Sequence, residues 1–145
     1  MDASAFEISA SGMRAQRLRM DLIANNMANA GTTSARRETM RTPDGQTFVR
    51  HIPYSRKTAV FMALPGGGVA VPRVVDDPAP FPSEHDPDHP HAVPAGPDAG
   101  LVFSPNVNSV IEMVDMMSAS RAYEANISAL DAMKSMQASA LRILA

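Results

Sequence analysis

The chain has 145 residues, which is enough for one ordinary domain or for a small domain with extended arms, and too few for a large multidomain enzyme. Apolar residues make up 45% of the chain and charged residues 19%, a balance that allows part of it to bury a core. The net charge of −2 gives no basic field for nucleic acid or for an anionic membrane. We therefore expect no nucleic-acid partner.

Cysteine is absent, which excludes disulfides and thiolate metal sites and predicts a chain indifferent to oxidation. The longest uninterrupted apolar run, Ala59–Leu64, is far shorter than the roughly 20 residues that a membrane-spanning helix needs. Asp2 and Glu7 stand where a secretory signal would have basic residues followed by an apolar segment. We expect no membrane span, and any export is expected to proceed without a cleavable signal peptide.

Proline divides the sequence into three segments. All twelve prolines lie between Pro43 and Pro105, and interior proline costs a helix about 3 kcal/mol. The two ends can therefore form long helices, and the middle cannot. The expected organisation is an N-terminal helical arm (1–35), a Pro-rich central β and loop domain (36–104) and a C-terminal helix (105–145).

The N-terminal segment has the pattern of an amphipathic helix. Ser4 and Glu7 have the spacing of a capping box, and Gly31 is suited to a left-handed cap that ends the helix near Ala30–Gly31. Apolar residues recur every seven positions, which is coiled-coil spacing, at Phe6, Met13, Met20 and Met27. This spacing predicts a seam that packs against another helix.

The C-terminal segment begins with a second S-x-x-E box at Ser109–Glu112, and neither proline nor glycine follows it. Alternating spacings of three and four residues form one line along the predicted helix, namely Ala119, Ala122, Asn126, Ala129, Met133, Met136, Ala140 and Ile143. The opposite side is polar, with Glu124, Ser128, Asp131, Ser135, Ser139 and Arg142. We expect a mainly α fold in which the terminal helices pack as a coiled-coil-like pair.

Short runs with β character stand between the helices, and the prolines separate them. The predicted strands are Thr47–Ile52, Thr58–Leu64, Val69–Val71, Val74–Val75 and Leu101–Phe103. Gly66–Gly68 has neither the Lys-Ser/Thr pair nor the following helix of a phosphate-binding loop, so we predict a turn. The seven prolines between Asp76 and Gly100 predict a loop without regular structure.

Two polar clusters invite a functional interpretation. His85, His89 and His91 lie close in sequence, but their proline-rich loop lacks the fixed surroundings of a zinc site, so we expect no metal, no cofactor and no enzymatic activity. Asn25, Asn26 and Asn29 crowd the end of the first predicted helix. They indicate either a capped, fraying helix end or amides that bond to neighbouring chains.

The run from Ala24 to Thr33, with its A-N-N-M-A-N core, resembles the N-terminal signature of the flagellar basal-body rod family. The C-terminal half resembles the proximal rod proteins of that family through Pro105–Asn108, Glu112–Val114, Ser118–Asn126 and Lys134–Met136. Looser similarity covers Pro53–Lys57, Gly68–Val71, Asp88–Pro90 and Gly100–Val102.

The resemblance implies a non-enzymatic subunit of the bacterial flagellar rod, a structure in the periplasm. It implies export by the flagellar type III apparatus and polymerisation with copies of itself and with other rod subunits. The terminal helices are the expected contact surface, through Phe6, Met13, Met20, Ile23, Asn25, Asn26, Met27, Asn29, Ala119, Ala122, Tyr123, Asn126, Ala129, Met133, Met136, Ala140 and Ile143.

Three alternatives remain open. One is another axial protein, such as a different rod subunit or a hook subunit. The second is a self-contained adaptor that binds one amphipathic helix in a groove. The third is a metal-dependent enzyme that uses the histidines of loop 85–91.

Overall fold

A computed structural model describes residues 5–42, 45 and 47–144. Their elements are two helices and three two-stranded antiparallel sheets, and they fall into two compact units. The helical unit comprises the described residues of 1–24, 58–75 and 110–145, and the loop unit those of 25–57 and 76–109. Within the described ranges, neither helix is both long and apolar enough to cross a membrane.

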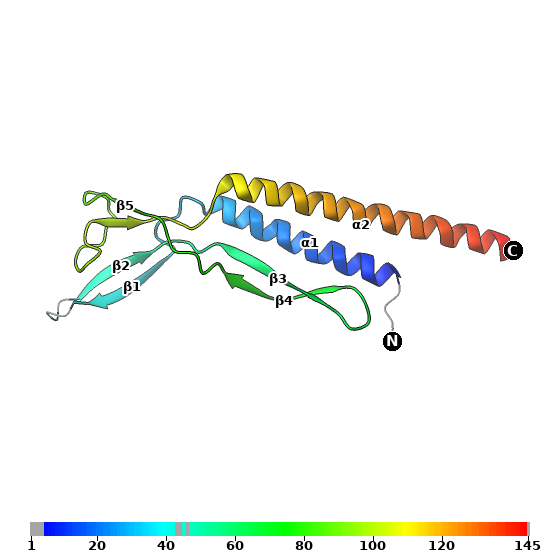
Figure 1. Cartoon of the computed structure of the whole chain (residues 1–145), viewed down its shortest axis with the longest axis horizontal. Coiled ribbons are helices and arrows are strands. Elements are labelled where there is room, and N and C mark those ends of the chain that lie inside the picture. The colour runs from blue at the N-terminus through cyan, green and yellow to red at the C-terminus, as the bar shows by residue number, and fades with distance from the viewer. Residues whose placement is uncertain (1–4, 43–44, 46, 145) are drawn as a thin grey trace. The chain divides into compact units, whose positions relative to one another are not determined.

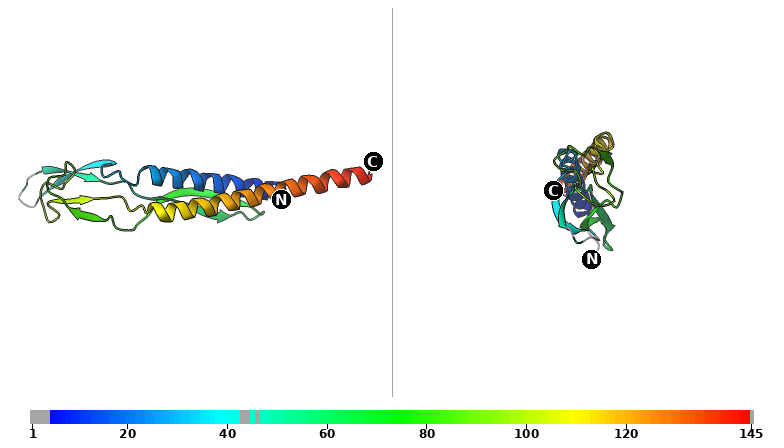
Figure 2. Two further views of the ribbon diagram at one scale, coloured as in Figure 1. Left: turned by 90° about the horizontal axis from the view of Figure 1, so that it is seen from above. Right: turned by 90° about the vertical axis from the view of Figure 1, so that its left-hand side faces the viewer.

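The helical unit contains most of helix α1 (Ala5–Ala28) and of helix α2 (Ser109–Leu144), together with a hairpin of strands β3 (Lys57–Ala63) and β4 (Val69–Asp76). Both views show the two helices side by side and antiparallel within this unit (Figures 1 and 2). The mainly α architecture with a small antiparallel β portion is thus confirmed. Most of the hairpin belongs to the same compact unit as the helices, although it lies within the Pro-rich segment 36–104 of the sequence.

Small side chains let helix α1 approach both of its neighbours. On one side, Ser11 Oγ accepts a hydrogen bond from the Val69 backbone N–H of the hairpin at 3.0 Å. On the other, a Cβ added to Gly12 would lie 3.1 Å from the Asn126 amide of α2. Arg19 donates to Asp115 of α2 at 2.9 Å. Helix α1 therefore contacts the hairpin through one face and α2 through another.

The turn between β3 and β4 depends on glycine. Gly67 and Gly68 have φ values of +94° and +91°, a region that other residues rarely adopt. The Leu64 N–H donates to the Gly68 carbonyl at 3.1 Å and closes the hairpin. The turn predicted at Gly66–Gly68 is therefore confirmed.

The loop unit contains two more antiparallel pairs. Strand β1 (Arg36–Arg41) pairs with β2 (Thr47–Ile52), with Arg36 opposite Ile52, and strand β5 (Ser83–His85) pairs with β6 (Leu101–Phe103). Among the described residues of this unit, the buried apolar side chains are Pro53, Tyr54, Val93, Val102 and Pro105. So small a core makes the hydrogen bonds of the connecting segments important for its stability.

The structure corrects several boundaries. The first helix ends at Ala28 rather than near Gly31, and Gly31 does not have a positive φ, because Asn29 closes the last turn through its backbone and side-chain bonds to Asn25. Ser4, the first residue of the expected capping box, lies outside the described residues. The S-x-x-E box predicts Ser109 as the cap of the second helix, but Ser109 is the first residue of α2, so Asn108 stands at the preceding position, which favours asparagine as a cap.

The strands show a similar mixture of outcomes. The ranges Thr47–Ile52 and Leu101–Phe103 are confirmed, and the two short runs around Pro72 merge into the single strand β4. In a two-stranded sheet a proline can place its missing donor away from the partner strand. Strand β1 was not predicted. The segment 76–100 was expected to lack regular structure, but it contains β5, whose backbone pairs with β6.

Candidate assembly surface

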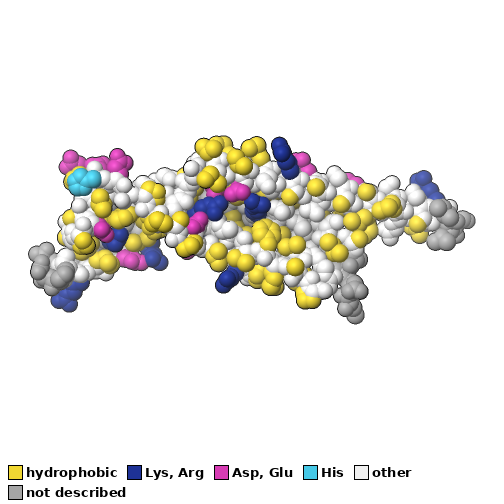
Figure 3. Space-filling view, viewed as in Figure 1, with side chains coloured by type: hydrophobic (Ala, Val, Ile, Leu, Met, Phe, Trp, Pro, Cys, Tyr) yellow, Lys and Arg dark blue, Asp and Glu magenta, His cyan; other side chains and the backbone are white. Residues whose placement is uncertain are grey.

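Helix α2 exposes an apolar stripe on its first two turns. Val110, Met113, Val114 and Met117 follow the i, i+3, i+4, i+7 spacing of one helix face, and their exposed fractions range from 46% to 65%. We call these four residues the outer stripe. Hydrophobic side chains gather on the surface at the start of α2 (Figure 3). Within the described chain this is the kind of surface that binds another protein.

The line of small residues predicted on α2 lies away from the outer stripe. Ala119 is fully buried, and Ala122 and Asn126 are half-buried where α2 meets α1. Tyr123, Ala129 and Met133 are also half-buried. The first part of the predicted line therefore packs inside this chain.

The last turns of α2 have a different environment. Their 134–142 side chains are all exposed, including Met136 at 65% and Ala140, and they continue past the start of α1 at Ala5 (Figures 1 and 2). The side chain of Ile143 lies outside the described residues. Helix α2 has 36 residues and α1 has 24, so α2 is longer by about 18 Å at 1.5 Å per residue. We call residues 134–142 the helix overhang.

On α1 the predicted heptad positions are only half-buried: Phe6, Met13, Met20 and Met27. The buried positions are mostly small or polar, namely Ser9, Ser11, Ala15, Ile23 and Asn26. Of the residues predicted as contacts on this helix, Ile23 and Asn26 are therefore buried by this chain itself.

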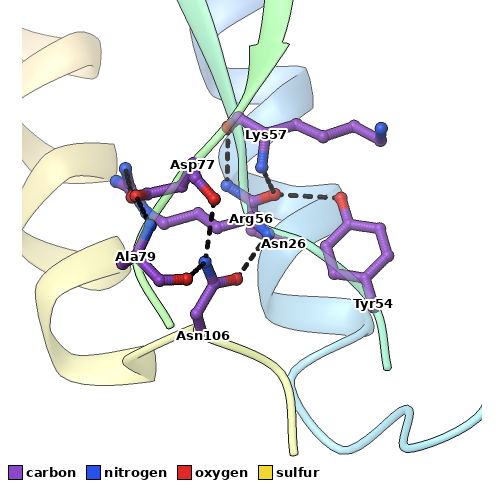
Figure 4. A network of polar contacts seen from close by, with 7 residues as sticks. All are labelled: Asn26, Tyr54, Arg56, Lys57, Asp77, Ala79 and Asn106. Carbon is purple, nitrogen blue, oxygen red and sulfur yellow. Dashed lines mark hydrogen bonds and ion pairs between the residues drawn. The ribbon is translucent and has the colours of Figure 1, made fainter. Parts of the chain in front are cut away.

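Asn26 is 1% exposed and belongs to a dense set of hydrogen bonds in the loop unit (Figure 4). Its Nδ2 donates to the Lys57 carbonyl at 3.0 Å, and its Oδ1 accepts from the Lys57 N–H at 2.9 Å. The Tyr54 hydroxyl donates to the same Oδ1 at 2.9 Å. One side-chain amide thus satisfies both backbone groups of one residue, much as a neighbouring strand would.

Asn106 binds the backbone of Arg56, the residue before Lys57, in a related way (Figure 4). Its Oδ1 accepts from the Arg56 N–H at 2.8 Å, and its Nδ2 donates to the carbonyls of Asp77 and Ala79 at 3.2 and 3.1 Å. We call Asn26 and Asn106, with the backbone they hold, the asparagine clasp. It joins the end of α1, the start of β3, the proline-rich segment and the approach to α2.

Charged side chains add to the clasp from its edges. Arg56 lies 3.5 Å from Asp77, and Lys57 donates to Asp76 at 2.9 Å. The hydrogen bond with Asp76 raises the pKa of Lys57, and partial burial of the ammonium group opposes this effect. Because these groups remain partly exposed, each pair contributes little beyond local order.

The other asparagines answer part of the question left open by the sequence. Asn29 Nδ2 donates to the Asn25 carbonyl at 2.9 Å, and the Thr32 hydroxyl donates to Asn29 Oδ1 at 3.3 Å. Asn25 is exposed and accepts from the Tyr54 hydroxyl at 3.2 Å. All three amides therefore have partners within this chain.

The structure brings together two of the three histidines predicted from the sequence, since the rings of His89 and His91 lie edge to face with centroids 5.2 Å apart. His85 is exposed on β5, whereas His91 stacks on His51 of β2 with ring centroids 4.6 Å apart. His91 Nδ1 lies 2.7 Å from the Thr33 hydroxyl, and His51 Nδ1 lies 2.7 Å from that of Ser34. Across the described ranges, no three His, Cys, Asp or Glu side chains are placed to hold a metal ion.

Sequence reasoning missed the outer stripe and the clasp. The stripe has a clear signal, since its four residues show helical spacing, but it stands opposite a longer line that draws attention first. The clasp has a weaker signal in the sequence. Asparagines at a helix end and before a helix indicate capping, and their spacing does not reveal that both bind the same dipeptide.

Two family models match the ends of the chain. Residues 6–36 match the model described as flagella basal body rod protein, and residues 99–143 match the model described as flagellar basal body rod FlgEFG protein C-terminal. The two matches contain Asn26 and Asn106, the two side chains of the clasp.

Curated relatives align over nearly all of the chain. The flagellar basal-body rod protein FlgC of Borreliella burgdorferi is 41% identical, over 97% of this chain and 96% of the relative. The FlgC proteins of Salmonella typhimurium and Bacillus subtilis are 40% and 33% identical, over 95% and 96% of this chain and 94% and 95% of their own. With such identity over almost the full length, the chain belongs to the FlgC family of flagellar basal-body rod proteins.

Proposed function

We propose that this chain is a structural subunit of the flagellar basal-body rod and that it binds neighbouring subunits through the outer stripe and the helix overhang. Membership of the FlgC family supports the structural role. The contact surface rests on one observation: apolar side chains of both regions lie exposed on α2, with Val110 and Met136 at 65% each. Burial of such surface against other subunits is favourable at about 25 cal/mol per Å².

The two regions suit an assembly that grows. The overhang continues the line of Ala119, Ala122 and Asn126, which already packs against α1, so a helix of similar shape from a neighbour can extend the same contact. The outer stripe lies on another side of α2 and binds a different neighbour. Two unlike surfaces on one helix give a heterologous, non-closing arrangement, which is how a shaft lengthens.

The remaining contact residues predicted from the sequence belong to the same proposal. Phe6, Met13, Met20 and Met27 of α1 are half-buried and present their remaining surface to neighbouring rod subunits. Exposed Asn25 is available to a neighbour's backbone, whereas Asn26 serves the interior of this chain. The pairing of terminal helices between subunits has coiled-coil character in this proposal.

We further propose that the protein acts in the periplasmic part of the basal body after export by the flagellar type III apparatus. Its role is mechanical rather than enzymatic, without a metal, a cofactor or a nucleic-acid partner. The rod proteins named among its relatives support this class of function. Partners are copies of this chain and other rod subunits.

The test introduces a charge at two exposed positions, where the substitution is expected to leave the fold of the isolated chain unchanged. Val114→Asp in the outer stripe and Met136→Asp in the overhang place a carboxylate at sites that are 57% and 65% exposed. Each variant is expressed in a strain that lacks its own rod subunit, and swimming is scored in soft agar. We expect both to lose swimming because a buried unpaired carboxylate is costly at an interface.

Ser128→Asp is the matched control, since Ser128 is exposed on the polar part of α2. It is expected to swim like the unchanged protein. Circular dichroism of each purified variant must show the same melting temperature as the parent chain. Normal swimming by Val114→Asp would remove the outer stripe from the assembly surface.

A further inference from the structure

The sulfur of this chain is all in methionine. The sequence contains 11 methionines and no cysteine. Among the described residues, five methionine side chains are exposed, namely Met40, Met62, Met113, Met117 and Met136. Met113 and Met117 are exceptional because they lie one turn apart on the outer stripe, with exposed fractions of 46% and 54%.

We propose that Met113 and Met117 form a peroxide-sensitive site, and that their oxidation to sulfoxide prevents the outer stripe from binding a neighbouring subunit. The effect on assembly rests on the function proposed above. In the reaction, a thioether sulfur attacks one oxygen of hydrogen peroxide, an S–O bond forms and the O–O bond breaks. The sulfur loses two electrons, and the other peroxide oxygen takes up the proton of the transferred oxygen and leaves as water.

The positions of the two side chains explain why this modification matters. Each is four residues from the other and alternates with Val110 and Val114, so two sulfoxides make half of the stripe polar. An apolar contact would then have to bury two strong hydrogen-bond acceptors. The half-buried neighbour Met116 is less accessible to peroxide. The absence of cysteine therefore does not make the chain indifferent to oxidation.

The first measurement locates the oxidised residues. The purified full-length chain is treated briefly with dilute hydrogen peroxide, digested, and analysed by mass spectrometry for peptides that have gained one oxygen atom. We expect Met113 and Met117 to oxidise several-fold faster than half-buried Met116 and Met20. Equal rates at all four positions would overturn the site.

The second measurement asks what the modification does to assembly. Met113→Gln with Met117→Gln imitates two sulfoxides, since glutamine has similar length and a polar oxygen, and Met113→Leu with Met117→Leu keeps the stripe apolar. In a strain that lacks its own rod subunit, we expect the leucine pair to swim and the glutamine pair to lose swimming. Both pairs must match the parent chain in thermal melting.

The outcomes separate this proposal from the function on which it rests. Swimming by the glutamine pair, while Val114→Asp is immotile, leaves the rod function intact and overturns the oxidation effect. Ser128→Gln tests the substitution itself on the polar part of α2 and is expected to swim. If the unchanged chain does not restore swimming, the rod function fails, and the peptide map still decides whether Met113 and Met117 are preferred targets.

Discussion

At the scale of single residues, the largest side chains with less than 2% exposure are both polar. Glu112 and Asn26 have exposed fractions of 0% and 1%. Burial of a polar group is tolerated when its hydrogen bonds are made, and unmade bonds are costly. In the loop unit, which buries few apolar side chains, the asparagine clasp is therefore a major source of specificity.

Replacement of Asn26 tests this conclusion. Asn26→Ala would remove the side-chain partner of the Lys57 N–H and carbonyl and the shorter hydrogen bond of the Tyr54 hydroxyl, so we expect the free energy of unfolding to fall by about 2–4 kcal/mol. Chemical denaturation followed by circular dichroism measures this loss. Asn25→Ala, at an exposed position, is the control and is expected to cost less than about 1 kcal/mol. Similar losses for both would contradict the importance of the clasp.

His51 gives the stability a dependence on pH. Partial burial, followed by the nearby charges of His91 and Arg37, lowers the pKa of His51 below its ordinary value of 6.5. The unfolded chain therefore takes up a proton near this pH, while the folded chain resists protonation until the pH is lower. Stability is then greatest above the unfolded pKa and falls as the pH drops below it.

Denaturation at about pH 7.5 and about pH 5.5 checks this expectation. His51→Gln removes the titrating group and retains a side chain that can bond to the Ser34 hydroxyl. We expect the variant to lose less stability on acidification than the parent chain. An unchanged difference between the two pH values would assign the effect to other groups.

At the scale of elements, strands with apolar side chains are predictable from the sequence, whereas a strand held only by backbone pairing is not. Strand β2 and strand β6 have apolar runs, and their ranges were predicted exactly as the structure has them. Strand β1 is Arg36–Arg41, mostly charged and exposed, and it exists because its backbone pairs with β2 along its length. Side-chain patterns carry no signal for such a strand.

The helix ends show the same limit. The start of α2 is predicted to within one residue, because the S-x-x-E box favours Ser109 as the cap and the structure has Ser109 as the first helical residue. The end of α1 was placed too late, since the sequence favours glycine as a cap and the structure uses Asn29. Competition between two plausible caps depends on tertiary contacts, which a single sequence does not contain.

The surface of α2 was predictable in part. The polar side at Glu124, Ser128 and Asp131 is exposed, in agreement with its pattern. The line through Ala119 is predicted to pack against the N-terminal helix and against neighbours, and Ala119 itself is buried within this chain. Periodicity identifies an apolar face, but it does not say whether the same chain or another one covers it.

At the scale of the whole molecule, the helical unit combines firmly packed and unsupported parts on one helix. Ala119 is completely buried, whereas every side chain of the helix overhang, 134–142, is exposed. Local opening requires little free energy where few contacts must break. We therefore expect the last turns of α2 to open more readily than the part of the helix that packs against α1.

Hydrogen exchange of the purified chain tests this contrast. We expect amides of the overhang to exchange rapidly and those around Ala119 to be protected, because the region around Ala119 packs against α1 and the overhang does not. Strong protection throughout α2 would indicate a finished bundle in the isolated chain and would favour the adaptor hypothesis. The experiment needs no variant, because the two regions of α2 are compared within the same chain.

The asparagine clasp also bears on how this sequence can diverge. Asn26 holds Lys57 through its backbone, and Asn106 holds the backbones of Arg56, Asp77 and Ala79. The clasp itself therefore places no demand on the identity of the four side chains that it holds, apart from the need for a free N–H at 56 and 57. We therefore expect the clasp to tolerate substitutions at 56 and 57 that keep the backbone N–H, and not to tolerate the loss of either amide, so tolerant and intolerant positions lie in direct contact in the loop unit.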